Sequence, residues 1–140
     1  MDKLKATMLL YDSDNFPLVV VHFQPSSWEK DAYNAFIAAI EGLLVRGAQE
    51  QQPISLLVKG SRHEQLQKQY IPTVLYGWLI YDIVRLRPLF EYGLHRSAIF
   101  TPDDHLNFFF EMLFKVYTPT RPLQLFDDYE AAQTWVSADR

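Results

Sequence analysis

The sequence contains no cysteine, which excludes several classes of protein at once. Disulfide scaffolds, zinc fingers, thiol catalysis and iron–sulfur ligation all need that residue, and its absence suits a reducing compartment. Positive charge is also scarce, with 13 Lys and Arg residues against 17 Asp and Glu residues and a net charge of −4. A nucleic-acid binder needs a basic face to displace counterions from phosphate groups, so we expect no nucleic-acid partner.

Apolar runs long enough to cross a membrane are missing as well. The longest apolar region, residues 71–84, contains Pro72 and Asp82, and it falls short of the roughly 18 residues that a spanning helix needs. The apolar stretch at residues 6–11 ends at Asp12, which is too early for a secretory signal. We therefore expect a cytoplasmic protein without a membrane span.

Motifs for metals and nucleotides are also absent. The sequence has neither of the glycine-rich patterns that hold phosphate groups, Gly-x-x-x-x-Gly-Lys-Ser/Thr and Gly-x-Gly-x-x-Gly. No two histidines have the His-x-x-x-His spacing of a helical metal site. We expect no cofactor and no metal, since the histidines are scattered at His22, His63, His95 and His105.

The residues that are present predict a single domain, residues 1–140, with one hydrophobic core. Runs rich in β-branched and aromatic residues predict strands at residues 7–11, 18–23, 54–58, 97–100 and 123–126. Apolar residues spaced three and four apart predict helices at residues 28–47, 63–87, 106–117 and 129–136. The order ββαβαβαβα predicts an α/β sandwich, whose mixed sheet of about five strands begins with an N-terminal hairpin.

Proline, glycine and capping residues mark the expected helix ends. Gly47 is placed to end the first helix, Pro72 to break the second and Pro88 to close it. Four helix starts show a Ser, Thr or Asp followed three residues later by an acid, a pair that satisfies free amide groups of the first turn. These pairs are Ser26 and Glu29, Ser61 and Glu64, Thr101 and Asp104, and Asp127 and Glu130.

The last third of the chain carries a family pattern. Arg96 precedes a short apolar strand, a helix and a strand ending in phenylalanine follow, and the terminal helix contains Glu130, Ala131 and Trp135. This pattern resembles small bacterial STAS-like (SpoIIAA-like) proteins, whose terminal helix carries an acid-Ala-x-x-Trp motif. Here one extra residue separates Ala131 from Trp135, unless Ala132 takes the alanine position. The resemblance implies a fold of roughly five strands and four helices, found in regulators that antagonise anti-sigma factors and in proteins of uncharacterised role.

Ser61 is the phospho-regulatory candidate that the resemblance implies. In the regulators, the signalling residue is a serine at the start of the helix after the central strand, and Ser61 lies at the comparable place. Phosphate there would lie at a helix N-terminus beside Lys59 and Arg62, which is electrostatically favourable. The alternative is that Ser61 only caps its helix together with Glu64.

Asp82 interrupts an otherwise apolar helical stretch. A buried acid in an aromatic pocket could have a raised pKa and act as a general acid or base. The alternative is an ion pair with Arg85, three residues further along the helix. Arg85, Arg87, His95 and Arg96 also lie near one another in sequence and could hold an anionic ligand, or they could form a solvated set of salt bridges.

Aromatic residues carry the most positional information. The chain has 10 Phe, 8 Tyr and 3 Trp, and more than half of them lie between residues 70 and 117. The two helices of that region are apolar on more than one side, so more than one side must be covered. A second subunit, a ligand cavity or one large core could cover them. The candidate interface or pocket residues are Trp78, Tyr81, Asp82, Arg85, Arg96, Phe108, Phe109 and Met112.

These observations lead us to expect a non-catalytic regulatory or protein-interaction module that forms a homodimer through helices 73–87 and 104–117. The alternative is a binder of a small apolar or lipid-like ligand, held between the same helices with Arg85 and Arg96 near the mouth of the pocket. An enzymatic role would rest on Asp82 and a histidine, and no catalytic motif supports it.

Overall fold

The computed structural model describes residues 9–12, 15–23, 30–60, 73–102 and 104–138. The strands in these ranges are β1 (Leu9–Asp12), β2 (Leu18–Phe23), β3 (Ile54–Gly60), β4 (Leu94–Phe100) and β5 (Leu123–Phe126). The helices are α1 (Lys30–Gln49), α3 (Thr73–Arg85), α4 (Arg87–Gly93), α5 (Asp104–Val116) and α6 (Tyr129–Ser137). The α/β class predicted from the sequence is confirmed.

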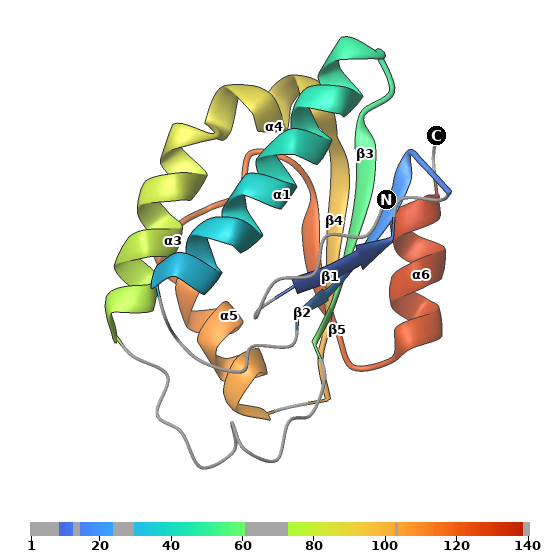
Figure 1. The fold of residues 1–140 in the computed structure, drawn as a ribbon. Coiled ribbons are helices and arrows are strands. Elements are labelled where there is room, and N and C mark those ends of the chain that lie inside the picture. Colours follow the sequence, from blue (N-terminus) through green and yellow to red (C-terminus); the bar gives the residue numbers. More distant parts are fainter. Residues whose placement is uncertain (1–8, 13–14, 24–29, 61–72, 103, 139–140) are drawn as a thin grey trace.

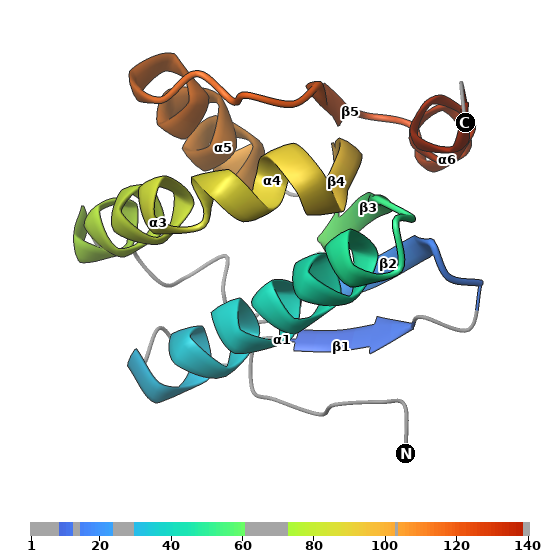
Figure 2. The ribbon, with the colours of Figure 1, turned by 90° about the horizontal axis from the view of Figure 1, so that it is seen from above.

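The sheet is built in the order of the sequence, β1-β2-β3-β4-β5. Strand β1 pairs antiparallel with β2, and the pairs from β2 to β5 are all parallel. Connections between parallel strands are right-handed, so a sheet that grows in one direction carries its connecting helices on one face. Accordingly, α1, α3, α4 and α5 lie on one face of the sheet, and α6 covers the other (Figures 1 and 2).

Each central strand contributes to both faces because successive side chains alternate. Val58 of β3 pairs with Val21 and Ile99 on the neighbouring strands, and these three residues belong to the core beneath α1, α3 and α5. Leu57 and its partner Ala98 belong instead to the smaller core under α6. The alternation therefore divides the interior into two cores.

Gly47 does not end the first helix, contrary to the sequence-based prediction. Helix α1 continues to Gln49, and Gly47 lies where a Cβ atom would be 2.9 Å from the carbonyl oxygen of Gly93 at the end of α4. A Cβ atom on Gly93 would in turn collide with the Leu44 carbonyl group of α1. The two glycines thus allow α1 and α4 to approach closely, while the left-handed position after the helix belongs to Gln51, with φ 54°.

Pro88 opens a helix where the sequence-based prediction had it closing one. It lies in the first turn of α4, where its missing N–H group costs no hydrogen bond. Strand β4 then follows α4 directly and starts at Leu94, before the predicted residues 97–100. The cap of α6 also differs, because Asp128 rather than Asp127 accepts a hydrogen bond from the Ala131 N–H group, at 2.8 Å.

Candidate functional site

A cavity of about 160 Å³ lies between the sheet and the helices α1, α3, α4 and α5. Its wall is almost entirely hydrophobic. The polar residues that line it are Tyr33, Asp82, Ser97, Tyr117, Thr120 and Arg121. Apolar cavities of about 150 Å³ stay dry and bind molecules such as benzene. The wall and the volume therefore suit a small apolar molecule.

Aromatic rings form one side of this cavity. Phe109 on α5 is buried, and its ring centroid lies 4.3 Å from that of Tyr76 on α3. Along α5, Phe110 contacts Phe109 edge to face at 5.4 Å and stacks with Phe114 at 6.4 Å. Phe109, Phe110 and Phe114 all line the cavity. Aromatic residues that cluster in the sequence thus form a rigid part of the cavity wall.

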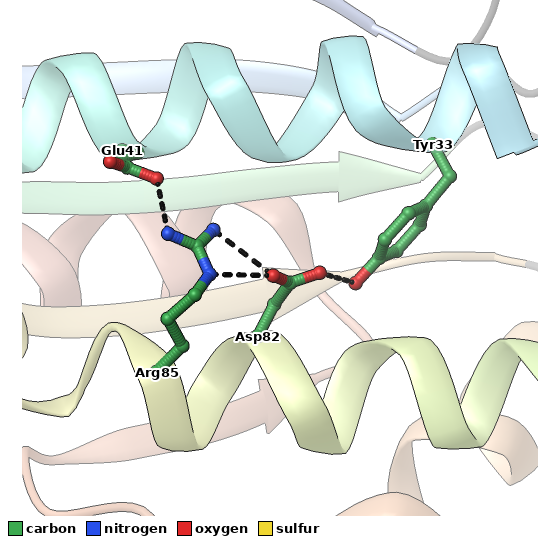
Figure 3. A network of polar contacts seen from close by, with 4 residues as sticks. All are labelled: Tyr33, Glu41, Asp82 and Arg85. Atoms are coloured by element: carbon green, nitrogen blue, oxygen red, sulfur yellow. Dashed lines mark hydrogen bonds and ion pairs between the residues drawn. The ribbon is translucent and has the colours of Figure 1, made fainter.

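A network of polar contacts joins α1 to α3 at the cavity wall (Figure 3). The Tyr33 hydroxyl group donates to Asp82 Oδ2 at 2.7 Å, and Arg85 Nε and Nη2 both lie 3.0 Å from Asp82 Oδ1. Arg85 Nη1 donates to Glu41 Oε1 at 2.9 Å. Asp82 is only 8% exposed, and both of its carboxylate oxygens are engaged.

The environment of this network raises the pKa of two of its members, Tyr33 and Arg85. Burial, and then the hydrogen bond to Asp82, raises the pKa of Tyr33 above its ordinary value, so its hydroxyl group remains a donor at neutral pH. Hydrogen bonds to Glu41 and Asp82 raise the pKa of Arg85. Of the two alternatives for Asp82, the structure shows the ion pair with Arg85 and adds a hydrogen bond from a distant tyrosine.

Arg96 lies on the other face of the sheet, so its predicted place at the mouth of the pocket is wrong. Its Nη1 atom donates to the Trp135 carbonyl oxygen at 2.9 Å, and its guanidinium group lies 4.6 Å from the centroid of the Trp135 ring. Side chains alternate along β4, so Ser97 and Ile99 line the cavity while Arg96 contacts α6. Arg85 and Arg96 therefore do not share an anion site.

The segment between α5 and β5 contributes the most exposed part of the cavity wall, here called the mouth, and sequence reasoning missed Thr120 and Arg121. Tyr117, Pro119, Thr120 and Arg121 all line the cavity, and Thr120 is the most exposed of the described lining residues. Arg121 donates from Nε to the Leu94 carbonyl oxygen at 3.0 Å and from Nη2 to that of His95 at 3.3 Å. Nothing in the local pattern of this loop distinguishes it from an ordinary connection.

Tyr117 carries an unusual hydroxyl group. Its oxygen atom is shielded from solvent and has no hydrogen-bond partner among the described residues. Buried hydroxyl groups normally have a partner, because leaving one unpaired is costly. The sequence offered one signal for this site, which is a tyrosine at the end of a phenylalanine-rich helix. Such a tyrosine places a hydroxyl group among apolar rings.

The remaining predicted site residues separate into buried and exposed groups. Trp78 is half-buried, and its ring centroid lies 5.3 Å from that of Tyr33. Lys30 Nζ lies 4.5 Å from the centroid of the Trp78 ring. By contrast, Tyr81 is 68% and Phe108 is 62% exposed. Met112 is also exposed. Ser61 lies outside the described residues.

Within the described ranges, no three His, Asp or Glu side chains come together as possible metal ligands. None of the helices in these ranges combines the length and apolar character needed to cross a membrane. Comparison of the chain with family models, with curated proteins and with solved structures found no match. The candidate site consequently rests on its own geometry, which is an apolar cavity with a polar mouth.

Proposed function

We propose that this chain is a non-enzymatic binding protein that holds a small apolar molecule in the cavity under α1, α3, α4 and α5. The cavity itself carries the proposal. A ligand that fills this space of about 160 Å³ binds the folded chain and not the unfolded one, and it therefore raises the free energy of unfolding. Domains are stable by only roughly 5–15 kcal/mol, so a ligand that fills this space has a large effect on stability.

Binding rather than catalysis is favoured by the state of the polar groups in the wall. Asp82 is the only acidic residue among the described lining residues, and Tyr33 and Arg85 both donate hydrogen bonds to its carboxylate oxygens. These partners hold the carboxylate in place and compete with a substrate for its lone pairs. Asp82 therefore acts in this proposal as a positioning link between α1 and α3.

The proposal is tested by titrating the protein with indole and following the backbone amide resonances. We expect the largest shifts at residues that line the cavity, and a rise in Tm with ligand concentration. Val58→Phe places a ring in the cavity and should abolish binding, while Val74→Phe adds the same ring at an exposed position of α3 and should leave it intact.

If Val58→Phe fails to fold, Leu79→Phe provides a second way to fill the same space from α3. Absence of shifts at the lining residues in the wild type would contradict the proposal. Unchanged indole affinity in a folded filling variant would do the same, because the probe would then bind elsewhere.

A second candidate function is homodimerisation or protein recognition through the outer sides of α3 and α5. Phe108, Met112 and Val116 follow one another at four-residue spacing on α5, and all three are exposed. Tyr81 and Val84 on α3 are exposed as well. Clusters of exposed aromatic, methionine and aliphatic side chains are typical of protein interfaces.

Sedimentation at micromolar concentration tests this candidate. We expect a dimer for the wild type and a monomer for Phe108→Glu, with Gln133→Glu at an exposed position of α6, on the other face of the sheet, as the control for the added negative charge. A monomeric wild type removes this candidate and leaves the cavity proposal untouched.

We also propose a relation to STAS-like regulators, supported by the way the residues of the terminal motif contact one another. Ala132 is fully buried while Ala131 is exposed, which favours Ala132 as the alanine three residues before Trp135, with Glu130 then two residues before that alanine. Trp135 in turn contacts Arg96 and the Phe126 ring, the latter at 5.6 Å.

In that relation Ser61 is the candidate for phosphorylation. Intact-mass measurement of the protein from its own host tests it. A phosphate located at Ser61 supports the regulatory role, and an unmodified mass under all growth conditions contradicts it.

A further inference from the structure

The mouth of the cavity differs chemically from its interior. Most of the wall consists of Leu, Ile, Val and Phe side chains, whereas Tyr117, Thr120 and Arg121 add polar groups from the segment between α5 and β5, where Thr120 is exposed. A ligand held with its apolar body inside therefore presents its other end to these three residues. The character of that end follows from the charges and hydrogen-bonding groups found there.

Arg121 brings a positive charge that no acid among the described residues neutralises. Its Nε and Nη2 atoms donate to the carbonyl oxygens of Leu94 and His95, which are neutral acceptors. A guanidinium group has five N–H donors, so donors remain for a ligand. Arg85 is different, because Asp82 and Glu41 both pair with it.

The Tyr117 hydroxyl group adds a donor at the same end. It is buried, belongs to a residue four positions before Arg121 in the segment that lines the cavity, and has no partner in the described part of the protein. A phenolic O–H group and a guanidinium group that line the same cavity are suited to a carboxylate, which accepts several hydrogen bonds at once.

Other charge types fit this mouth poorly. A cationic ligand would meet Arg121 on its way in, and the acid in the wall, Asp82, has both oxygens engaged by Tyr33 and Arg85. The protein as a whole has a net charge of −4, so no general attraction draws anions to it. A preference for anions must come from the local charge at Arg121.

We infer that the ligand of the cavity is a small monocarboxylic acid with an apolar body, whose carboxylate lies against Arg121 and the Tyr117 hydroxyl group. This inference rests on the proposed function, because it specifies the chemistry of the molecule that the cavity holds. The volume of about 160 Å³ limits the apolar body to about the size of one aromatic ring or a short branched or linear chain.

Three probes with the same carbon skeleton test the inference: 3-phenylpropionate, 3-phenylpropan-1-ol and 3-phenylpropylammonium. Their dissociation constants are measured at pH 7 by titration calorimetry or by amide resonance shifts. We expect the acid to bind at least about tenfold more tightly than the alcohol, since a hydrogen bond to a charged group is worth that much or more. The ammonium probe should bind most weakly, and added salt should reduce the preference for the acid.

Variants separate the charge at the mouth from the cavity behind it. Arg121→Gln should reduce the acid-to-alcohol preference to about one while leaving the affinity for the alcohol unchanged. Tyr117→Phe should weaken acid binding by about threefold to tenfold. Arg87→Gln removes an exposed arginine that does not line the cavity and serves as the matched control.

Arg121 also donates to two backbone carbonyl groups, so Arg121→Gln could unfold the mouth. Arg121→Lys keeps the charge, and it should retain an acid preference smaller than that of the wild type. Val58→Phe should abolish binding of the acid and of the alcohol alike, which places both probes in the cavity.

The outcomes are distinguishable. If the alcohol binds and the acid binds no better, the inference is wrong and the proposed function stands. If the alcohol does not bind, the proposed function fails first. If folded Arg121→Gln keeps the acid preference, or if Arg121→Lys keeps it at its full wild-type size, the carboxylate lies elsewhere and the inference is overturned.

Discussion

The two faces of the sheet are packed in different ways. Under α6, two alanines meet at the centre, Ala98 from β4 and Ala132 from the helix, and both are fully buried beside Leu57 and Val136. On the other face, several helices supply mostly large side chains, and a cavity of about 160 Å³ remains among them. Small residues let one helix approach the sheet closely, whereas rigid rings from several helices leave space between them.

The polar contacts of the helices also differ between the two faces of the sheet. On the face of the cavity, a buried carboxylate connects α1 and α3 through Tyr33, Asp82 and Arg85. On the α6 face, the exposed Asp128 caps the helix, and Arg96 binds a carbonyl oxygen near its end. The hollow face depends on an internal polar link, and the compact face depends on close packing.

The largest expected effect tests that internal link. Asp82→Ala leaves the Tyr33 hydroxyl group buried without its acceptor and should lower the free energy of unfolding by about 3 kcal/mol, measured by urea denaturation. The control is Glu41→Gln, which weakens the part-exposed ion pair with Arg85 and should cost less than about 1 kcal/mol. Equal effects of the two substitutions would show that the buried link is not special.

Enlarging a side chain on each face should give the next largest difference. Ala132→Leu has no free space and should destabilise the protein by about 1–3 kcal/mol. Val58→Phe adds a comparable volume beside the cavity and should change stability by less than about 1 kcal/mol. Thermal unfolding of both variants measures this difference in stability. Similar losses of stability in the two variants would mean that the two faces of the sheet are equally tightly packed.

Alkaline pH should destabilise the face of the cavity through Tyr33. Its folded-state pKa is raised above the ordinary value of about 10, first by burial and then by its bond to Asp82. The contribution of this group is therefore complete below pH 10 and is lost as pH rises further, by up to about 1.4 kcal/mol per pH unit. Tyr33→Phe should flatten the decline.

The control for this measurement is Tyr81→Phe, which removes an exposed hydroxyl group from α3. A wild-type decline that persists unchanged in Tyr33→Phe would locate the alkaline sensitivity outside the polar network.

The smallest effect concerns the start of α6. Asp128→Ala removes the side-chain cap on the Ala131 N–H group and should cost about 1 kcal/mol. Asp127→Ala, one residue earlier, should change stability by less than about 0.5 kcal/mol. Chemical denaturation measures the loss of stability in each variant. A larger loss for Asp127→Ala would show that Asp127 is the cap, as predicted from the sequence.

Local chemistry predicted many elements of this fold, and it failed where distant segments meet. Proline marks helix ends but also suits the first turn of a helix, which is where Pro88 lies. Glycine marks helix ends but also allows two helices to cross closely, which is the role of Gly47. Contacts with distant segments decide which of these roles each residue has. The partner of Asp82 on its own helix, Arg85, was predictable from a spacing of three. Tyr33, 49 residues away, was not.

The candidate site shows the same division. Periodicity identified the aromatic helices and placed Phe109 and Asp82 near a possible pocket, because spacing along one helix is a local property. It could not place Arg96 on the α6 side, since that depends on which face of β4 meets the other helices. It also did not single out Arg121, whose position at the mouth results from how the loop after α5 returns to the sheet.

The sequence by itself determined the α/β class, most of the strands and helices, and the concentration of rings in one region, because these follow from residue type and from periods of two and 3.6 residues. Only the tertiary structure decided which rings were buried, where a cavity remained and which charges lay at its mouth. Those properties depend on how closely separate elements can pack, and packing is set by the shapes of side chains that meet from distant parts of the chain.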